Sequence, residues 1–408
     1  MSLASHLTRT HKISLLVALY LAQGLPYGFF TQALPVLLRE AGYSLKMISA
    51  LSLLYLPWAL KFLWAPWLDH RGAPRRWLLL FQGASIVGAL ALTQLQLDHG
   101  LIAVLIAAFF FNLIAASQDV VTDGLAVRML DASERGYANG IQVGAYRLGM
   151  IFGAGVLLIV FARTNWAVMF ACMAALLALT VLPVAFLPAM PRPAVEPVET
   201  KTLLLAWFRR MLTPGMLGFA GLIFCYRFGD AMVSNVLGPF LSDAGLDKET
   251  IGAMKGVAGN ATSLVGAVLG GWYVFRVSRR QAMLVTGLAQ AVAFVLYIVA
   301  ACGIGGTSLL WVATVTEGVI GTTATVALFT LMMDASDPEH AGTDYTLFAS
   351  FFVLVNSAGT FASATIVDAF GYAPAFIVGT VLAVAGVLAL VGTLDRRPTS
   401  TRIADAWR

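Results

Sequence analysis

Residues 101–126 read LIAVLIAAFFFNLIAASQDVVTDGLA, and this stretch decides the class of fold. A helix needs about 20 predominantly apolar residues to cross the hydrocarbon core of a bilayer, and this run is longer than that. Its only charged side chains are Asp119 and Asp123. The stretch therefore predicts a membrane-spanning helix that carries an acidic pair.

The remainder of the chain repeats this pattern. Of its 408 residues, 59% are hydrophobic and 12% are charged, whereas soluble domains contain about 25% charged residues. So little charge argues against a soluble enzyme, a nucleic-acid-binding protein and a secreted disulfide scaffold. We expect an all-α polytopic membrane protein. Its twelve predicted transmembrane helices lie at 13–35, 45–66, 77–97, 101–126, 138–162, 166–187, 214–240, 251–275, 281–302, 307–333, 344–367 and 372–394.

The distribution of Lys and Arg predicts the orientation of these spans. With the N-terminus inside, the cytoplasmic segments hold 18 of the 26 basic residues and the outer loops hold five. An excess of Lys and Arg marks the cytoplasmic side. We therefore expect both termini to be cytoplasmic. The three remaining basic residues, Lys61, Arg147 and Arg227, fall within predicted spans.

The chain divides into two similar halves. The sequence Asp-Ala-Ser occurs at 131–133 after the fourth span and again at 334–336 after the tenth. We predict a six-helix bundle at 1–187, a Pro-rich cytoplasmic linker at 188–213 and a second six-helix bundle at 214–408. Parallel repeats of six spans are the layout of major facilitator transporters.

Metal and nucleotide chemistry find no support. The three cysteines lie in apolar runs and the five histidines in the N-terminus or loops, so buried metal ligands are not available from either type. No Gly-Lys-Ser or Gly-Lys-Thr occurs to hold a nucleotide phosphate. We expect no catalytic residue, metal or cofactor, and no enzyme activity.

The loop after the second span resembles the signature of the major facilitator superfamily, Gly-x-x-x-Asp-Arg-x-Gly-Arg-Arg. Asp69 and Gly72 match it, while Ala65 replaces the first glycine and His70 replaces the arginine. The basic pair is displaced. This resemblance implies a major facilitator fold and a cytoplasmic gate, which we assign to Lys61, Asp69, Arg71, Gly72, Arg75, Arg76 and Arg276.

A narrower resemblance covers nearly the whole chain. It is similar to the AmpG-type muropeptide permeases, a family that includes the RhtX/FptX-type siderophore permeases and the eukaryotic acetyl-CoA transporters. The resemblance implies an inner-membrane importer driven by protons, while the segment 342–347 resembles the siderophore branch. The stretches that carry it are 20–26 (YLAQGLP), 58–66 (WALKFLWAP), 117–123 (SQDVVTD), 134–136 (ERG), 146–149 (YRLG) and 226–231 (YRFGDA).

Charged side chains within spans are expected to line the transport path, because charge within the bilayer is costly. Asp119 and Asp123 share a helix face, and two close carboxylates seldom both ionise. One can therefore carry a proton; the alternative is an ion pair with Arg147 or Arg128. Arg147 either neutralises Asp119 or binds an anionic substrate.

The second half carries a comparable set. Arg227 and Asp230 are three residues apart, so they either neutralise each other or act in substrate binding and proton coupling. Glu317 has no Lys or Arg in its own span, and its partner would be Arg227. We treat Asp119, Asp123, Asp230 and Glu317 as proton-coupling candidates. The substrate-binding candidates are Gln23, Tyr27, Gln118, Gln142, Tyr146, Arg147, Tyr226, Arg227 and Asn356.

The glycines support two interpretations. Gly24 and Pro26 either break the first span to expose backbone carbonyls or allow close helix packing. The runs at 149–155 and 266–271 have small-residue spacing that favours close packing.

We expect a monomeric transporter in the bacterial inner membrane that binds a small-molecule substrate and protons. The leading hypothesis is import of a bulky polar solute, either a ferric siderophore or an anhydro-muropeptide, by alternating access. The alternatives are an exporter such as a drug efflux pump, a membrane-embedded transferase and a receptor without transport activity.

Overall fold

A computed structural model describes residues 7–40, 54, 56–95, 97–187, 200–396 and 401–407. Every regular element in those ranges is helical. The predicted linker 188–213 and the second predicted span, 45–66, are only partly within them. The described residues fall into two compact units, one of residues 1–131, 141–205 and 336–350 and the other of residues 132–140, 206–335 and 351–408. Each unit consists mainly of one predicted half and also contains one short segment from the other.

Unit 1 begins with a long helix that changes its winding. Helix α1 (Arg9–Gly28) runs into the π-helix η2 (Phe29–Ala33) and then into α2 (Leu34–Glu40). The next span is broken, into α4 (Leu56–Leu60), the 3₁₀-helix η4 (Lys61–Leu63) and α5 (Ala65–His70). Pro57 and Pro66 lie in this region and cannot donate backbone hydrogen bonds.

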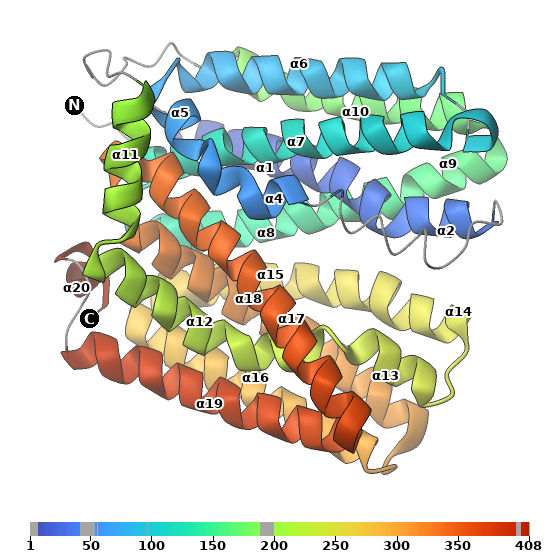
Figure 1. Cartoon of the computed structure of the whole chain (residues 1–408), viewed down its shortest axis with the longest axis vertical. Helices are drawn as coiled ribbons and strands as arrows, with labels where there is room; N and C mark the ends of the chain where they lie inside the picture. The colour runs from blue at the N-terminus through green and yellow to red at the C-terminus, as the bar shows by residue number, and fades with distance from the viewer. Residues whose placement is uncertain are drawn as a thin grey trace. The chain divides into compact units, whose positions relative to one another are not determined.

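The remainder of unit 1 packs around α7. Helix α6 packs against both α7 and α10 and is drawn above α7 in Figure 1. Helix α1 also packs against both α7 and α10. The unit also holds α8 from residue 141 onward and the first ten residues of α18. The bounds are α6 (Pro74–Leu92), α7 (Leu97–Met129), α8 (Arg135–Ile151), η5 (Phe152–Val156), α9 (Leu157–Arg163), α10 (Trp166–Ala185), α11 (Thr200–Met211), η7 (Pro338–His340) and α18 (Ala341–Phe370).

Unit 2 has its own packed core. Helix α16 packs against α17 and α19, α19 packs against α12, and α15 packs against α17. The short C-terminal helix α20 contacts α16 and α17. The bounds are α12 (Pro214–Ser234), α13 (Leu237–Asp243), α14 (Lys248–Ile251), η6 (Gly252–Ala258), α15 (Gly259–Arg276), α16 (Arg279–Ala301), α17 (Gly306–Ala335), α19 (Tyr372–Arg396) and α20 (Thr401–Trp407).

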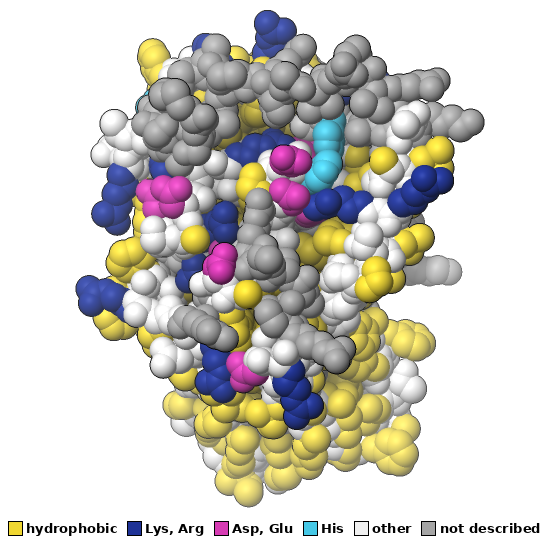
Figure 2. All heavy atoms as spheres, turned by 90° about the vertical axis from the view of Figure 1, so that its left-hand side faces the viewer, with side chains coloured by type: hydrophobic (Ala, Val, Ile, Leu, Met, Phe, Trp, Pro, Cys, Tyr) yellow, Lys and Arg dark blue, Asp and Glu magenta, His cyan; other side chains and the backbone are white. Residues whose placement is uncertain are grey.

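The helices have the length and composition of membrane spans. In the part of the chain that the structure describes, nine helices are long and apolar enough to cross a membrane. The other three predicted spans are mainly helical where they are described, and the second and eighth are divided by changes of helix type. Charged side chains gather over part of the face in Figure 2, whereas apolar side chains cover its lower part.

Glycines set the closest helix contacts in both units. A Cβ atom at Gly24 would lie 2.1 Å from the carbonyl oxygen of Tyr146, and one at Gly153 would lie 1.9 Å from that of Leu25. In unit 2, a Cβ atom at Gly266 would lie 2.3 Å from a backbone oxygen of α17. The prediction of close packing is confirmed.

The structure also distinguishes between the two interpretations of Gly24, a break in the first span or close helix packing. Helix α1 continues through Gly24 and Pro26, so the predicted break does not occur there. Only after Pro26 does the helix widen into η2. Gly24 therefore serves helix packing.

Candidate functional site

Helix α7 holds a buried ion pair in unit 1. The Lys61 ammonium contacts the Asp119 carboxylate, and their side chains are 4% and 10% exposed. The 3₁₀ turn η4 presents Lys61 to α7 at the point where the second span is broken. Asp119 therefore pairs with Lys61 rather than with Arg147 or Arg128, the partners given as the alternative to proton binding, and Arg128 pairs with Asp69 instead.

Asp123 lies one helical turn further along α7 and has a different environment. Its Oδ1 accepts a hydrogen bond of 2.7 Å from the Tyr20 hydroxyl. Asp119 and Lys61 both act on it electrostatically. Asp123 is 2% exposed, so its charge state depends on these few neighbours.

An aromatic group lies further along α1. The ring of Tyr27 packs against Trp58 at 5.8 Å and against Tyr146 at 5.5 Å between centroids. Trp58 donates a hydrogen bond of 3.2 Å to Asn112. Trp58 also lies beside the Lys61 ammonium, 5.6 Å from ring centroid to nitrogen, and so connects the aromatic group to the ion pair.

Arg147 lies beside this aromatic group. It is half-buried and interacts electrostatically with Tyr27. Among the residues that the structure describes, Arg147 has no acidic partner. Helix α8 itself carries no Asp or Glu. A guanidinium in this position can bind an anion with charge-assisted hydrogen bonds.

Three glutamines surround the same region. Gln23, Gln118 and Gln142 are all buried, as their assignment to substrate binding leads us to expect. Neither amide atom of Gln23 has a hydrogen-bond partner among the described residues, and the same holds for Nε2 of Gln118. Since buried amide groups are nearly always hydrogen-bonded, these side chains are available to a ligand or to water.

Unit 2 presents a different arrangement. The Arg227 guanidinium pairs with Asp230 on the same helix, and the amide of Gln290 also donates to Asp230. The Ser234 hydroxyl lies 3.2 Å from one oxygen of Asp230 and 3.2 Å from one of Glu317. Arg227, Gln290 and Ser234 thus share Asp230, and Ser234 extends this polar network to Glu317.

Unit 2 contains two further charged residues, Glu317 in α17 and Lys255 in η6. Glu317 interacts electrostatically with Lys255, and its expected pairing with Arg227 stays a prediction. Lys255 lies in the helical segment η6, within the predicted span 251–275.

The remaining candidates of unit 2 lie around Arg227. Its Nε donates to Oδ1 of Asn356 at 3.2 Å, and its guanidinium lies 4.6 Å from the ring centroid of Phe352. Tyr226 is buried next to it in sequence. Arg227 is therefore held on several sides by its own unit.

Asp69 binds the start of α18 within unit 1. Its side chain is 1% exposed and pairs with Arg128. The backbone and hydroxyl of Thr343 both donate to Oδ2 of Asp69, at 2.9 Å each. Nearby, Nε2 of His70 lies 2.9 Å from Nδ1 of His340. Within the segment 342–347, Thr343 therefore has a structural role, because it binds Asp69.

Asp334 is the centre of a buried ion-pair cluster in unit 2. Its side chain is 1% exposed and receives Arg135 Nη1 and Arg279 Nε, both at 2.7 Å. Arg279 also donates to the carbonyl oxygen of Ala132 at 2.7 Å. Sequence reasoning missed this cluster, although the repeated Asp-Ala-Ser marked Asp334.

The other predicted gate residues are more peripheral. Gly72 has φ of 81°, which favours glycine. Arg75 donates to the carbonyl oxygen of Ala185 at 2.7 Å. Arg71 and Arg76 are exposed, and so is Arg276, whose guanidinium lies 5.8 Å from the Trp272 ring centroid.

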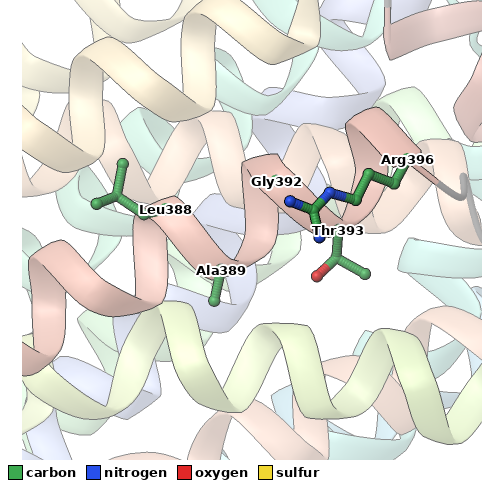
Figure 3. A pocket seen from close by; sticks show the side chains of 5 residues that line it. All are labelled: Leu388, Ala389, Gly392, Thr393 and Arg396. Carbon is green, nitrogen blue, oxygen red and sulfur yellow. The ribbon is translucent and has the colours of Figure 1, made fainter.

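Two hollows of the described surface are lined by other residues. The hollow in Figure 3, about 510 Å³ in volume, runs along α19 between Leu388 and Arg396, and that single helix supplies its whole lining. A second, of about 440 Å³, lies beside Asp243 and Tyr372 in unit 2. Neither includes a predicted site residue.

Comparisons with known proteins agree with this architecture. The family model described as Major Facilitator Superfamily matches residues 16–360 and 219–408. An anhydromuropeptide permease of Escherichia coli is 26% identical over 394 residues, covering 93% of this chain and 79% of that protein. An uncharacterized protein of Haemophilus influenzae is 29% identical over 392 residues, covering 90% of this chain and 91% of that protein.

Solved structures share the fold. The human organic anion transporter MFSD10 matches with a TM-score of 0.75 and 14% identity, over 93% of this chain and 99% of that one. The Escherichia coli fucose:proton symporter FucP matches with a TM-score of 0.73 and 11% identity, over 93% and 97%.

The apolar helices and their buried charged clusters define a multi-pass membrane transporter rather than an enzyme. The chain belongs to the major facilitator superfamily. The predicted fold and the resemblance to AmpG-type permeases are confirmed.

Proposed function

We propose that this protein imports an anionic, sugar-containing solute of the anhydro-muropeptide class across the bacterial inner membrane, coupled to protons. The observation that carries the proposal is the state of Arg147. It is half-buried among aromatic and amide side chains, and it lacks an acidic partner within the described residues. Even partial burial of a guanidinium without a counter-ion is unfavourable, so a substrate anion is its natural partner.

The neighbours of Arg147 narrow the class of substrate. Tyr27, Trp58 and Tyr146 offer aromatic faces and edges, against which the apolar faces of sugar rings can pack. Gln23 adds a buried amide whose two polar atoms are free to hydrogen-bond. Sugar rings, amides and carboxylates together are the groups of a muropeptide, and a similar protein of Escherichia coli is named for that substrate.

The proposed transport cycle is the alternating access that major facilitator transporters use. Two bundles would alternate about a central site, with both termini on the cytoplasmic side, as the Lys and Arg distribution favours. The Asp69 and Asp334 clusters would hold helix ends while the cytoplasmic side is closed and would release them when it opens. Buried carboxylates would carry the coupled proton.

Uptake by proteoliposomes tests the proposal. Radiolabelled anhydro-muropeptide would be offered under an inward proton gradient, with and without a protonophore, to wild type and Arg147→Gln. We expect gradient-driven accumulation that the protonophore abolishes. Loss of a charge-assisted contact costs about 1.5–3 kcal/mol, which predicts uptake about 10- to 100-fold weaker for the variant at limiting substrate.

A second arm distinguishes the closest alternative. A carboxylate ferric siderophore also offers anions to Arg147, and the same vesicles would be tested with it. If only the siderophore were taken up, the substrate would be an iron carrier and not a muropeptide. Uptake that the protonophore does not reduce would contradict proton coupling. If vesicles loaded with substrate released it but empty vesicles took none up, the protein would be an exporter.

A further inference from the structure

The buried charges on α7 do not balance. Lys61, Asp119 and Asp123 form one cluster within unit 1. If all three were ionised, the cluster would carry one uncompensated negative charge. Asp119 is 7% exposed and Asp123 2%, and an uncompensated charge at such depth is strongly disfavoured. One proton would remove the imbalance.

Lys61 determines which carboxylate keeps its charge. Its ammonium contacts Asp119 directly, and both side chains are buried. Protonating Asp119 would leave a buried ammonium without a counter-ion, which costs several kcal/mol. Asp119 therefore stays ionised as the fixed partner of Lys61.

Asp123 lacks such a partner. Its hydrogen-bond donor is the neutral Tyr20 hydroxyl at 2.7 Å, and the hydroxyl of Tyr345 from α18 also faces it. No cation besides Lys61 reaches it in the described part of the chain. Arg128 is occupied by Asp69. Arg147 lies by Tyr27, seven residues and about 10 Å along α1 from Tyr20.

We propose that Asp123 is the residue that binds and releases the coupled proton, while Lys61 holds Asp119 permanently ionised. The proposal rests on the proposed proton-coupled function. The proposal distinguishes between the two carboxylates, both of which are proton-coupling candidates from the sequence. Gln23, one turn from Tyr20 on α1, and Gln118, beside Asp119, have buried amide atoms without partners among the described residues and can hydrogen-bond to a proton carrier.

Lys61 also connects the proton site to the proposed substrate site. Its ammonium lies 5.6 Å from the centroid of Trp58, whose ring packs against Tyr27. A substrate that moves Trp58 changes the position of Lys61 and hence the field at both carboxylates. Binding of the substrate and of the proton are linked by this route.

The test uses a reagent for protonated carboxyl groups and needs no substrate. The purified full-length protein would be treated at neutral pH with N,N′-dicyclohexylcarbodiimide, a hydrophobic carbodiimide, and the adduct at each residue measured by mass spectrometry. We expect at least about tenfold more adduct on Asp123 than on Asp119, the ratio that one unit of difference in pKa produces. In Lys61→Met, Asp119 should become reactive as well.

Transport by the matched variants provides the second measurement. Asp123→Asn should lose gradient-driven accumulation but retain exchange of substrate across the membrane, because the substrate site is intact. Asp119→Asn leaves Lys61 unpaired and should lose both, and Lys61→Met/Asp119→Asn should recover exchange. Tyr20→Phe removes a donor to the ionised carboxylate, so its transport should depend on pH with a midpoint at higher pH.

The outcomes separate two failures. Greater labelling of Asp119, equal labelling of the two residues, or no labelling of either would overturn the assignment of Asp123, and so would full coupling in Asp123→Asn. Absence of muropeptide or siderophore uptake with the expected labelling would instead overturn the proposed substrate and leave the proton site in place.

Discussion

The two units each carry an arginine deep in a span, yet only one of these arginines is neutralised within its unit. Arg227 pairs with Asp230, three residues along the same helix. Arg147 lies on α8, which contains no acidic residue, and has no acidic partner among the described residues. The difference indicates that unit 1 supplies the charge that selects an anion, while unit 2 supplies a self-contained polar network.

The lysines of the two units show the opposite difference, because the paired lysine is in unit 1. Lys61 in unit 1 is committed to a buried carboxylate, whereas Lys255 in unit 2 is exposed and interacts with Glu317 at longer range. Of these four cations, Lys61 and Arg227 are tightly paired, whereas Arg147 and Lys255 are less constrained. In unit 1 the less constrained cation is the arginine, which is the better group for binding carboxylates.

Asp334→Asn should have the largest effect, because it removes the shared partner of two buried guanidiniums, those of Arg135 and Arg279. Breaking a buried pair costs about 3–5 kcal/mol. Thermal unfolding in detergent measures the loss. Asp395→Asn in the same unit is the matched control, since its pair with Arg280 is exposed, and it should unfold like wild type. An Asp334→Asn protein as stable as this control would contradict the account.

Gly153→Ala should be next, because its Cβ would meet the backbone oxygen of Leu25 at 1.9 Å. Overpacking costs about 1–3 kcal/mol, so the melting temperature should fall. Gly155→Ala, two residues away with open space around its Cβ, should change it little. Similar melting temperatures for the two variants would show that α1 and η5 are not in close contact.

Substitutions of Arg227 and Asp230 test the polar network of unit 2. Arg227→Gln alone leaves Asp230 without its cation and should reduce uptake about tenfold, equivalent to 1.4 kcal/mol. Arg227→Gln/Asp230→Asn should recover most of it, because the two changes are coupled. Initial rates of uptake in vesicles provide the comparison. If the double variant were no better than the single one, Arg227 would also bind substrate.

Trp58→Phe should have the smallest effect. The ring remains aromatic, but the hydrogen bond to Asn112 is lost and the packing on Tyr27 is reduced. Aromatic contacts of this kind contribute about 0.5–1.5 kcal/mol, which corresponds to about a two- to tenfold weaker binding of substrate. Titration of the purified protein measures it, and Trp272→Phe, at an exposed position, should bind as wild type does.

The fold was accessible from the sequence because long apolar runs separated by basic loops leave few alternatives. The positions of charged residues within spans were accessible for the same reason. Their partners were not. Lys61 reaches Asp119 only because the second span is broken into a 3₁₀ turn, and no pattern of hydrophobicity reports such a break.

The same limit explains the Asp334 cluster. Arg135, Arg279 and Asp334 are far apart in sequence, and each lies in a loop or at a helix end, where charged residues are ordinary. Only packing within unit 2 brings them together. The repeated Asp-Ala-Ser signalled the position but not its partners.

The central claim is that Arg147 selects an anionic substrate. The most direct measurement is the affinity of the purified transporter for an anhydro-muropeptide and for its neutral carboxamide analogue, in wild type, Arg147→Gln and Arg227→Gln/Asp230→Asn. We predict that wild type and the double variant prefer the anion about 10- to 100-fold, the value of one charge-assisted contact, and that Arg147→Gln binds both alike. An undiminished preference in Arg147→Gln would contradict the account.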